Sequence, residues 1–493
     1  MQRRLILIDV GRSAPASPLG SLRPRGSGVR KARNPCRSLA DKASRPKDPG
    51  SAAFAMSRNF LSEHLLYLSV LLLPLSYGTK DWFSLDVRWI PPSLILALLS
   101  ALLHPKLGKS DFGASLLAIL VCWALATSLS AALFRPPESA DLTALYRVVR
   151  YPALLALCAV LFLRTRVSFS SSLLGSRALL LCLSAAVSLE LILAVYLVLA
   201  VSSAHAVPLA ELGRSRCEAQ TLRVGDISLC RLTGTYTEGP QFGMFMLVSL
   251  VMLSVASTGI FGRTRWTRWS LSTGLILSAA GVFASFSDQI YIGAAAFLLA
   301  VAAFALRKRQ PALALAALVT LAVAGAFLRT SLSWKWSQGD WAADGASALG
   351  SSFGERLFHA RFASTELAGT PYRFLFGVGQ GRYGEWLSVV EPAFPDTTSP
   401  QSTLVAWLAE YGITGAVGWI LFCGWVLLRS WRGYGILGFG AAVSLIAANM
   451  FQAQWVSEAW FLGLAFLTAS SPTPSTSSSR DCPRGRGRDG RVV

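Results

Sequence analysis

The chain has 493 residues, of which 53% are hydrophobic and only 15% are charged, and its mean hydropathy is +0.48. A soluble domain has about a quarter of its residues charged, so this composition excludes an ordinary water-soluble fold. The formal net charge of +20 would indicate nucleic-acid binding only if the basic residues shared a soluble surface. The distribution of charge along the chain therefore decides what the net charge means.

The two ends of the chain lack the hydrophobic periodicity of a folded domain. Residues 1–55 contain twelve basic and three acidic side chains among Pro, Ser and Gly, a composition typical of disorder. Their apolar run at 5–10 is too short for a signal peptide. We expect translation to begin at Met56, with a functional basic arm as the alternative. Residues 471–493 are rich in Ser, Pro, Arg and Gly and are predicted to form a disordered cytoplasmic tail.

Residues 56–470 contain many apolar segments of the length that crosses a bilayer, which is about 20 residues. We predict an all-α, polytopic integral membrane protein with about twelve transmembrane helices and two long loops on its outer face. The predicted spans are 60–77, 89–104, 112–133, 144–163, 173–201, 240–260, 270–286, 290–306, 311–328, 402–428, 433–452 and 454–470.

The basic residues between these spans predict the orientation of the protein. If the N-terminus is inside, the inner connections together with Arg177 carry thirteen basic residues and one acid, Asp111. The outer connections carry twelve basic residues and sixteen acids when Arg329, at a helix end, is set aside. Cytoplasmic loops of membrane proteins are enriched in Lys and Arg. The positive charge is therefore interpreted as a topological signal, with both termini in the cytoplasm.

Two of the eight cysteines, Cys217 and Cys230, lie in a predicted outer loop. Disulfides persist outside the cytoplasm, so we predict a Cys217–Cys230 disulfide, which would contribute about 3 kcal/mol through chain entropy; two unrelated thiols are the alternative. The chain has four scattered histidines and no CxxC or HExxH motif. No metal site is therefore expected.

Two outer segments, 202–239 and 329–401, are much longer than turns, and long loops in compact proteins usually carry function. Glycines at 377, 379, 381 and 384 of the second segment permit close approach of the backbone to a ligand. They match neither a P-loop nor a dinucleotide fingerprint, because no Lys-Ser/Thr pair or strand–helix frame follows. The motifs of the two segments, in chain order, are RLTGTY (231–236), GERL (354–357), LFGVGQGRYG (375–384) and QSTLVAWLAEYGITG (401–415).

This ordered set of motifs resembles the O-antigen ligase and Wzy-type polymerase family of bacterial membrane glycosyltransferases. The resemblance covers roughly residues 56–470 in hydropathy and loop order and is sharpest in 354–415. The family has, at the end of its large outer loop, a His followed by Asn, Ser or Gln, then nine residues, Gly, two residues, and Gly, Thr or Tyr. Ser402, Gly412 and Gly415 fall on that spacing.

The resemblance implies transfer or polymerisation of a glycan from an undecaprenyl-diphosphate carrier on the outer face of the bacterial inner membrane, without a metal or other cofactor. It implies that outer-face arginines hold the diphosphate, whose developing negative charge an Arg fork stabilises. Arg356 matches the family's arginine before the Gly-rich strip, whereas Asp288 or Gln289 replaces a second one. The predicted substrate-binding residues are Arg231, Gln289, Arg361, Arg382, Gly377 and Gly379.

Gln401 stands where the family has its loop His, which acts on the acceptor hydroxyl. A glutamine cannot accept a proton at neutral pH, although its amide can hydrogen-bond a hydroxyl or phosphate oxygen. Three hypotheses stay open. Gln401 orients the acceptor while Glu410, Glu238 or His359 acts as the base; the chain is a polymerase with other catalytic groups; or it binds lipid-linked glycan without turnover. The predicted catalytic residues are Gln401, Glu410 and Arg356.

Several of these residues also have a purely structural interpretation. Arg356 and Arg361 can flank an amphipathic helix on the membrane surface, with Leu357, Phe358 and Phe362 facing lipid. His359 is expected at the protein surface. An acid within a membrane span, such as Glu410, is a functional candidate by default, but it can also pair with nearby arginines.

Three classes of function follow from the sequence. The first is a ligase or polymerase acting on lipid-linked oligosaccharide, with a glycan or lipid acceptor as its other substrate. The second is a flippase or transporter for the same lipids, which predicts a charged pathway and internal repeats; few intramembrane charges are present, namely Arg147, Arg150 and Glu190. The third is a non-catalytic component of a polysaccharide-assembly complex. No nucleic-acid partner is expected.

Overall fold

The computed structural model describes most of the chain between Pro49 and Ala469. The chain divides into two compact units, Met1–Phe54 and Ala55–Val493, and every contact discussed below lies within the second. The described residues are 49–74, 91–104, 111–134, 142–202, 221–224, 227–230, 232–233, 236, 239–258, 264–338, 352–379, 382–390, 402–450 and 457–469.

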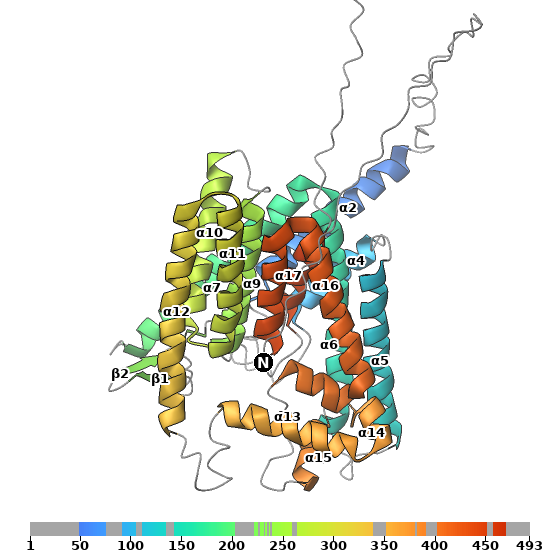
Figure 1. Ribbon diagram of the computed structural model, residues 1–493. Coiled ribbons are helices and arrows are strands. Elements are labelled where there is room, and N and C mark those ends of the chain that lie inside the picture. The colour runs from blue at the N-terminus through green and yellow to red at the C-terminus, as the bar shows by residue number, and fades with distance from the viewer. Residues whose placement is uncertain are drawn as a thin grey trace, which may run out of the picture. The chain divides into compact units, whose positions relative to one another are not determined.

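The described residues are almost entirely helical (Figure 1). The helices are α2 (Pro49–Leu71), α4 (Pro92–Leu103), α5 (Phe112–Phe134), α6 (Leu142–Ser171), α7 (Leu173–Ser202), α9 (Gly239–Ser257), α10 (Arg265–Ala284), α11 (Asp288–Arg307), α12 (Pro311–Gln338), α13 (Ser352–Ala368), α14 (Pro371–Phe376), α15 (Tyr383–Val390), α16 (Thr403–Met450) and α17 (Glu458–Thr468). The all-α prediction needs one local correction, because strands β1 (Thr221–Val224) and β2 (Ile227–Cys230) form an antiparallel hairpin in the first long outer segment.

Each predicted span overlaps a helix, and among the described residues six helices are long and apolar enough to cross a membrane. This indicates a multi-pass membrane protein. The six segments are Phe112–Ser130, Pro152–Ser171, Leu173–Leu199, Pro240–Ser257, Asp288–Arg307 and Thr403–Met450.

Three helices differ in extent from the predicted spans. α2 begins at Pro49, ahead of the predicted span 60–77, because the Ala-rich residues 52–55 favour helix. α12 continues past residue 328 to Gln338, and no Gly or Pro lies between residue 328 and Gly339. α17 has only 11 residues, fewer than the predicted 454–470.

α16 is a hairpin rather than one straight helix. Gly412 and Gly435 have left-handed φ values of 70° and 63° within it, and glycine adopts this conformation without steric cost. Near the two ends of α16, the hydroxyls of Ser402 and Thr403 donate to the carbonyls of Met450 (2.7 Å) and Asn449 (2.6 Å). The predicted spans 402–428 and 433–452 are therefore two arms that fold back on each other.

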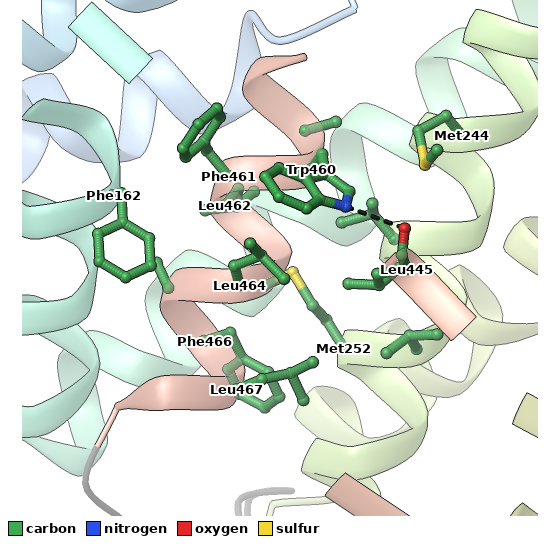
Figure 2. Packing of buried hydrophobic residues seen from close by; sticks show 14 of the residues in the cluster. Phe162, Met244, Met252, Leu445, Trp460, Phe461, Leu462, Leu464, Phe466 and Leu467 are labelled. Atoms are coloured by element: carbon green, nitrogen blue, oxygen red, sulfur yellow. Dashed lines mark hydrogen bonds between the residues drawn. The ribbon is translucent and has the colours of Figure 1, made fainter. Parts of the chain in front are cut away.

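α17 lies at the centre of the helical core. All of its residues are buried, and it packs against α6, α9 and α16. Figure 2 shows Trp460 donating its indole N–H to the carbonyl of Leu445 on α16, at 2.9 Å. Trp460 also stacks on Trp419, which stacks on Trp407, so aromatic rings join α17 to both sides of the Gly412 bend. A helix that is apolar on every side is stable only when protein or lipid surrounds it.

A buried ion pair joins α2, α4 and α6 at the ends that the charge distribution assigns to the inner side. Arg164 is completely buried and donates to the carboxylate of Glu63 at 2.6 Å. Its guanidinium also donates to the hydroxyls of Ser62 (3.0 Å) and Ser100 (3.1 Å), and the Ser168 hydroxyl donates to the other oxygen of Glu63 (2.8 Å). Hydrogen bonds on both partners offset part of the cost of burying the charges, although one guanidinium nitrogen of Arg164 is buried without a partner among the described residues.

A second ion pair fixes the start of α5. Asp111 accepts hydrogen bonds from the guanidinium of Arg166 and from the backbone N–H of Ala114 (3.0 Å). Arg166 lies over the ring of Trp425 and donates to the carbonyl of Thr468 at 3.4 Å. One arginine therefore connects α5, α6, α16 and the C-terminal end of α17.

Acidification is expected to weaken the Asp111 contact. Burial opposes ionisation of this carboxyl, but the hydrogen bonds from Arg166 and Ala114 outweigh burial and hold its pKa below the ordinary value of 3.8. Because the folded-state pKa is the lower one, the pair stabilises the fold above about pH 3.8, and this stabilisation is lost as the pH falls through the folded-state value. The effect is small, because a third of the Asp111 side chain is exposed.

Thermal unfolding in detergent, compared between wild type and Asp111→Asn from pH 6 to pH 3, measures this effect. The variant is expected to be the less stable at pH 6, and the difference is expected to shrink below about pH 3.8. A difference that stays constant across this range would contradict the assignment.

Candidate functional site

The glycine-rich strip after α14 and the first bend of α16 form one interlocked unit at the predicted outer face. The backbone N–H of Val378 donates to the carbonyl of Ala409 (2.9 Å), and the N–H of Gly379 donates to the carbonyl of Glu410 (3.1 Å). The Thr414 hydroxyl donates to the carbonyl of Leu375, just before the strip, at 2.6 Å. The motifs 375–384 and 401–415 are thus joined through their backbones.

Both sides of this interlocked unit require glycine. Gly377 and Gly412 have left-handed φ values of 75° and 70°, which side-chain-bearing residues adopt only at a cost. A Cβ on Gly377 would collide with the backbone of residues 410–411, and a Cβ on Gly412 would collide with the backbone of residues 375–376. The two glycines permit the close approach that brings the strip and the bend together.

A cavity of about 510 Å³ lies between this unit and α5, within the size range of small-molecule sites. Among the described residues, its lining includes Arg373 and Arg382, four hydroxyl-bearing side chains and no carboxylate. A lining with positive charge and no acid favours an anionic ligand. The lining residues are Trp123, Ala126, Thr127, Ser130, Thr370, Tyr372, Arg373, Phe376, Gly377, Val378, Gly379 and Arg382.

Arg382 is held at this cavity by the start of α15. Its side chain is 9% exposed, its N–H donates to the carbonyl of Gly379 (3.3 Å), and its carbonyl accepts the N–H of Trp386 (3.0 Å). Electrostatic interactions are stronger in such a partly dehydrated place than in water. An anion in the cavity would therefore gain from a charge that the fold already holds in position.

The opposite wall of the cavity comes from α5, and α14 lies beside the end of that helix (Figure 1). Trp123 stacks on Phe376 with 5.5 Å between ring centroids and donates its indole N–H to the carbonyl of Tyr411 (3.3 Å). The hydroxyls of Ser130 and Tyr372 are 3.5 Å apart. The cavity therefore offers aromatic surface and hydroxyl groups beside its two arginines.

Sequence reasoning identified Gly377, Gly379 and Arg382 as substrate-binding candidates, and the structure brings these three together in the lining. It missed Arg373 and the α5 residues. The α5 residues Trp123, Thr127 and Ser130 have the spacing i, i+4, i+7, which places them on one face of a helix. This stripe of polar and aromatic side chains on an apolar span could have indicated the cavity wall. Nothing in the sequence around Arg373 indicates a binding role, apart from its place in a long outer segment.

The structural alternative, in which Leu357, Phe358 and Phe362 face lipid, does not hold for Phe358 and Phe362. Phe362 is 8% exposed and packs against Tyr383 and Trp386 of α15, and Phe358 stacks on Phe362. α13, α15 and the first segment of α16 thus share a small hydrophobic core of their own. The apolar face of α13 has a protein partner, which the sequence did not indicate.

His359 was expected at the surface and is completely buried instead. Its Nδ1 is 2.7 Å from the hydroxyl of Tyr383, and the two rings meet edge to face. Tyr383 follows Arg382 directly in the chain, so the His359–Tyr383 hydrogen bond fixes the turn that carries this arginine.

The structure separates the remaining predicted residues. Glu410 is 6% exposed and contacts the strip through its carbonyl, but it does not belong to the cavity lining. Gln289 and Asp288 are at the start of α11, and Gln289 is 4% exposed and does not belong to the lining either. Arg361 is exposed on α13.

Several predictions fall where the structure gives no side-chain description. Gln401, Arg231, Glu238 and Cys217 lie outside the described residues. Arg356 is on α13 and Cys230 ends β2, but only their backbones are described. The Cys217–Cys230 disulfide therefore stays a prediction. Within the described part of the chain, no three His, Cys, Asp or Glu residues are grouped so as to hold a metal ion.

A second polar group is buried between the helices. Glu190 of α7 and Glu458 of α17 are 1% and 4% exposed, and Tyr236, before α9, is 3% exposed. Burial raises the pKa of Tyr236 well above its ordinary value, and the carboxylates of Glu190 and Glu458 raise it further. The RLTGTY motif thus ends in a tyrosine that lies near two buried acids.

Comparison of the sequence with models of known protein families, and with individually characterised proteins, finds no match in either case.

Proposed function

We propose that the chain is a membrane glycosyltransferase of the ligase or polymerase type, which transfers a glycan from an undecaprenyl-diphosphate carrier. In this proposal about twelve spans cross the bacterial inner membrane, both termini are cytoplasmic, and the long segments are outside. The observation that carries the proposal is the cavity, in which Arg373 and Arg382 lie beside the interlocked glycine strip with no acid among the described lining residues.

The chemistry of the leaving group supports this proposal. Transfer of a glycan from the carrier releases a diphosphate, on which negative charge accumulates as the glycosidic bond breaks. Guanidinium groups form paired, charge-assisted hydrogen bonds with phosphate oxygens, and donors that are fixed before the reaction lower its barrier most effectively. The hydroxyl groups and the Trp123–Phe376 pair suit the sugar and the first part of the lipid.

The proposed step is a direct displacement. The acceptor hydroxyl oxygen bonds to the anomeric carbon, the bond from that carbon to the diphosphate oxygen breaks, and the hydroxyl proton passes to a base. Glu410 is the base proposed from the sequence; its carbonyl accepts the N–H of Gly379, and its side chain is not among the described lining of the cavity. Gln401 is proposed to orient the acceptor through its amide, and Arg356 is retained as a further diphosphate contact from the resemblance.

Replacing Arg382 by Gln is expected to lower the rate of glycan transfer by about 100-fold or more, because one prepositioned charged donor is lost. Arg373→Gln is expected to act in the same direction. The measurement is transfer from purified undecaprenyl-diphosphate oligosaccharide to a glycan acceptor in reconstituted vesicles. Arg432→Gln, an exposed arginine on the α16 hairpin, controls for the general loss of positive charge. Unchanged transfer by both cavity variants would refute the proposal.

Transport of the same lipid-linked sugars is the alternative, and the buried Glu190, Glu458 and Tyr236 are the observation that favours it. Ionisable groups within a membrane are costly and often mark a transport path. Movement of labelled carrier across sealed vesicles without an acceptor, lost on Glu190→Gln and kept in Arg382→Gln, would favour transport. Carrier binding without transfer or transport would instead indicate a non-catalytic polysaccharide-assembly component.

A further inference from the structure

The first turn of α10 carries arginines and tryptophans in alternation. The helix begins Arg265-Trp-Thr-Arg-Trp269 and has no acidic residue in its first turn. Trp266 is 79% exposed and Trp269 is 62% exposed, and Arg265 and Arg268 are exposed as well. We call these four residues the α10 basic-aromatic face. Contiguous exposed apolar patches mark interaction surfaces, and tryptophan is enriched where one side of a surface is apolar and the other is wet.

The α10 basic-aromatic face points away from the rest of the protein. At about 100° per residue, its four side chains fall within an arc of about 160°. The buried residues of α10 occupy the opposite side of the helix, and Ile276 and Phe283 are exposed on the same side as Trp269. The buried set is Leu271, Gly274, Ser278, Gly281 and Val282. The outward side of α10 is therefore apolar along its length and basic-aromatic at one end.

The sequence predicts a membrane span over 270–286, which places this face at one end of that span. Of the 20 residues of α10, those that follow Trp269 extend about 22 Å, most of the roughly 30 Å of a bilayer's hydrocarbon core. If the exposed Ile276 and Phe283 contact lipid chains, the arginines and tryptophans lie at the level of the headgroups. Tryptophan is enriched at that level, because its ring is apolar and its N–H is polar.

The positive charge of the α10 basic-aromatic face favours lipids with anionic headgroups. No ion pair involves Arg265 within the described part of the chain, and arginine binds phosphate oxygens in pairs of hydrogen bonds. The turn between α11 and α12 also carries exposed basic residues, Arg307, Lys308 and Arg309, but it has no tryptophan. We infer that the α10 basic-aromatic face binds the headgroup of an anionic phospholipid of the surrounding leaflet.

This inference is independent of the glycan chemistry. It rests on the predicted span 270–286 crossing the bilayer, because α10 is not one of the six helices named above, and it uses none of the residues of the outer cavity. Arg265 and Arg268 contact the lipid phosphate, while Trp266 and Trp269 pack against the glycerol region and the first methylene groups. A zwitterionic lipid would fill the same apolar surface but would leave the positive charge less well compensated.

The test uses the purified full-length protein, stripped of co-purified lipid, and two probes with identical acyl chains, phosphatidylglycerol and phosphatidylcholine. Binding is counted by native mass spectrometry. Wild type is expected to bind phosphatidylglycerol at least about tenfold more tightly than phosphatidylcholine. R265Q/R268Q is expected to lose most of this preference, and W266L/W269L is expected to bind both lipids more weakly.

The matched control is R307Q/K308Q, which removes the same charge from a turn that has no tryptophan. This variant is expected to keep most of the preference. Equal binding of the two lipids by wild type, or equal effects of the control and R265Q/R268Q, would overturn the inference. Because the four substituted side chains are exposed, thermal unfolding is expected to be unchanged, which verifies that the variants are folded. Glycan transfer is measured separately, so its failure would not be mistaken for failure of lipid binding.

Discussion

Replacing Glu63 by Gln is expected to lower the free energy of unfolding by about 3 kcal/mol. The change leaves Arg164 charged in a place where no part of its side chain is exposed. The hydroxyls of Ser62 and Ser100 still accept hydrogen bonds from the guanidinium, but they supply no negative charge. Because Glu63 is 28% exposed, we place the cost at the lower end of the range for broken buried pairs.

The double variant Glu63→Gln/Arg164→Met distinguishes a broken ion pair from a general loss of packing. Removing both charges avoids the uncompensated cation, so the double variant is expected to be more stable than Glu63→Gln alone. Thermal or denaturant unfolding of purified protein in detergent measures both, together with the amount of protein in the membrane. A Glu63→Gln protein as stable as wild type would show that the pair contributes nothing to the fold.

Replacing Gly412 by Ala is expected to separate the α16 bend from the glycine strip. The left-handed φ of 70° alone costs an alanine about 1–2 kcal/mol, and the new Cβ would collide with the backbone of residues 375–376. Gly377→Ala produces the reciprocal collision with residues 410–411. Since both residues 377 and 379 line the cavity, displacement of about 1 Å there is expected to reduce glycan transfer about 100-fold.

Gly424→Ala is the matched control for these glycine variants. Gly424 lies in the same helix and has an ordinary φ, and a Cβ added to it would meet no other atom within 4 Å, so alanine is expected to be neutral or slightly stabilising there. Hydrogen exchange of residues 375–379 reports the separation directly, apart from any activity. Protected amides in Gly412→Ala, equal to those of Gly424→Ala, would contradict the interlocked arrangement.

The positions of the helices can be predicted from the sequence because the membrane imposes one dominant requirement on every spanning segment. A segment inside a bilayer must be apolar and must satisfy its backbone polar groups internally, so hydropathy identified a helix for each predicted span. The ends of α12 and α17 were missed because hydropathy does not respond to what stops a helix. The β1–β2 hairpin is too short for periodicity to indicate.

The sequence predicted the part of the site that depends on glycine, because several glycines close together in a long loop indicate close approach of the backbone. Gly377 and Gly379 indicated a close approach, and Arg382 was predicted to bind substrate because it lies next to them in the sequence. His359 was misplaced because its burial depends on α15, whose partner face lies 24 residues away. Arg373 and Trp123 meet at the cavity only through tertiary contacts between α14 and α5, and no local pattern encodes such a meeting.

The burial of α17 has a consequence for how the protein is made. Its residues Glu458–Thr468 occupy the middle of the helical core, yet they are synthesised after all the helices that surround them. The eleven residues extend only about 16 Å, too short to span a bilayer alone. α6, α9 and α16 must therefore remain open to receive this segment until it has been synthesised. A chain that ended before Glu458 would lack its own centre.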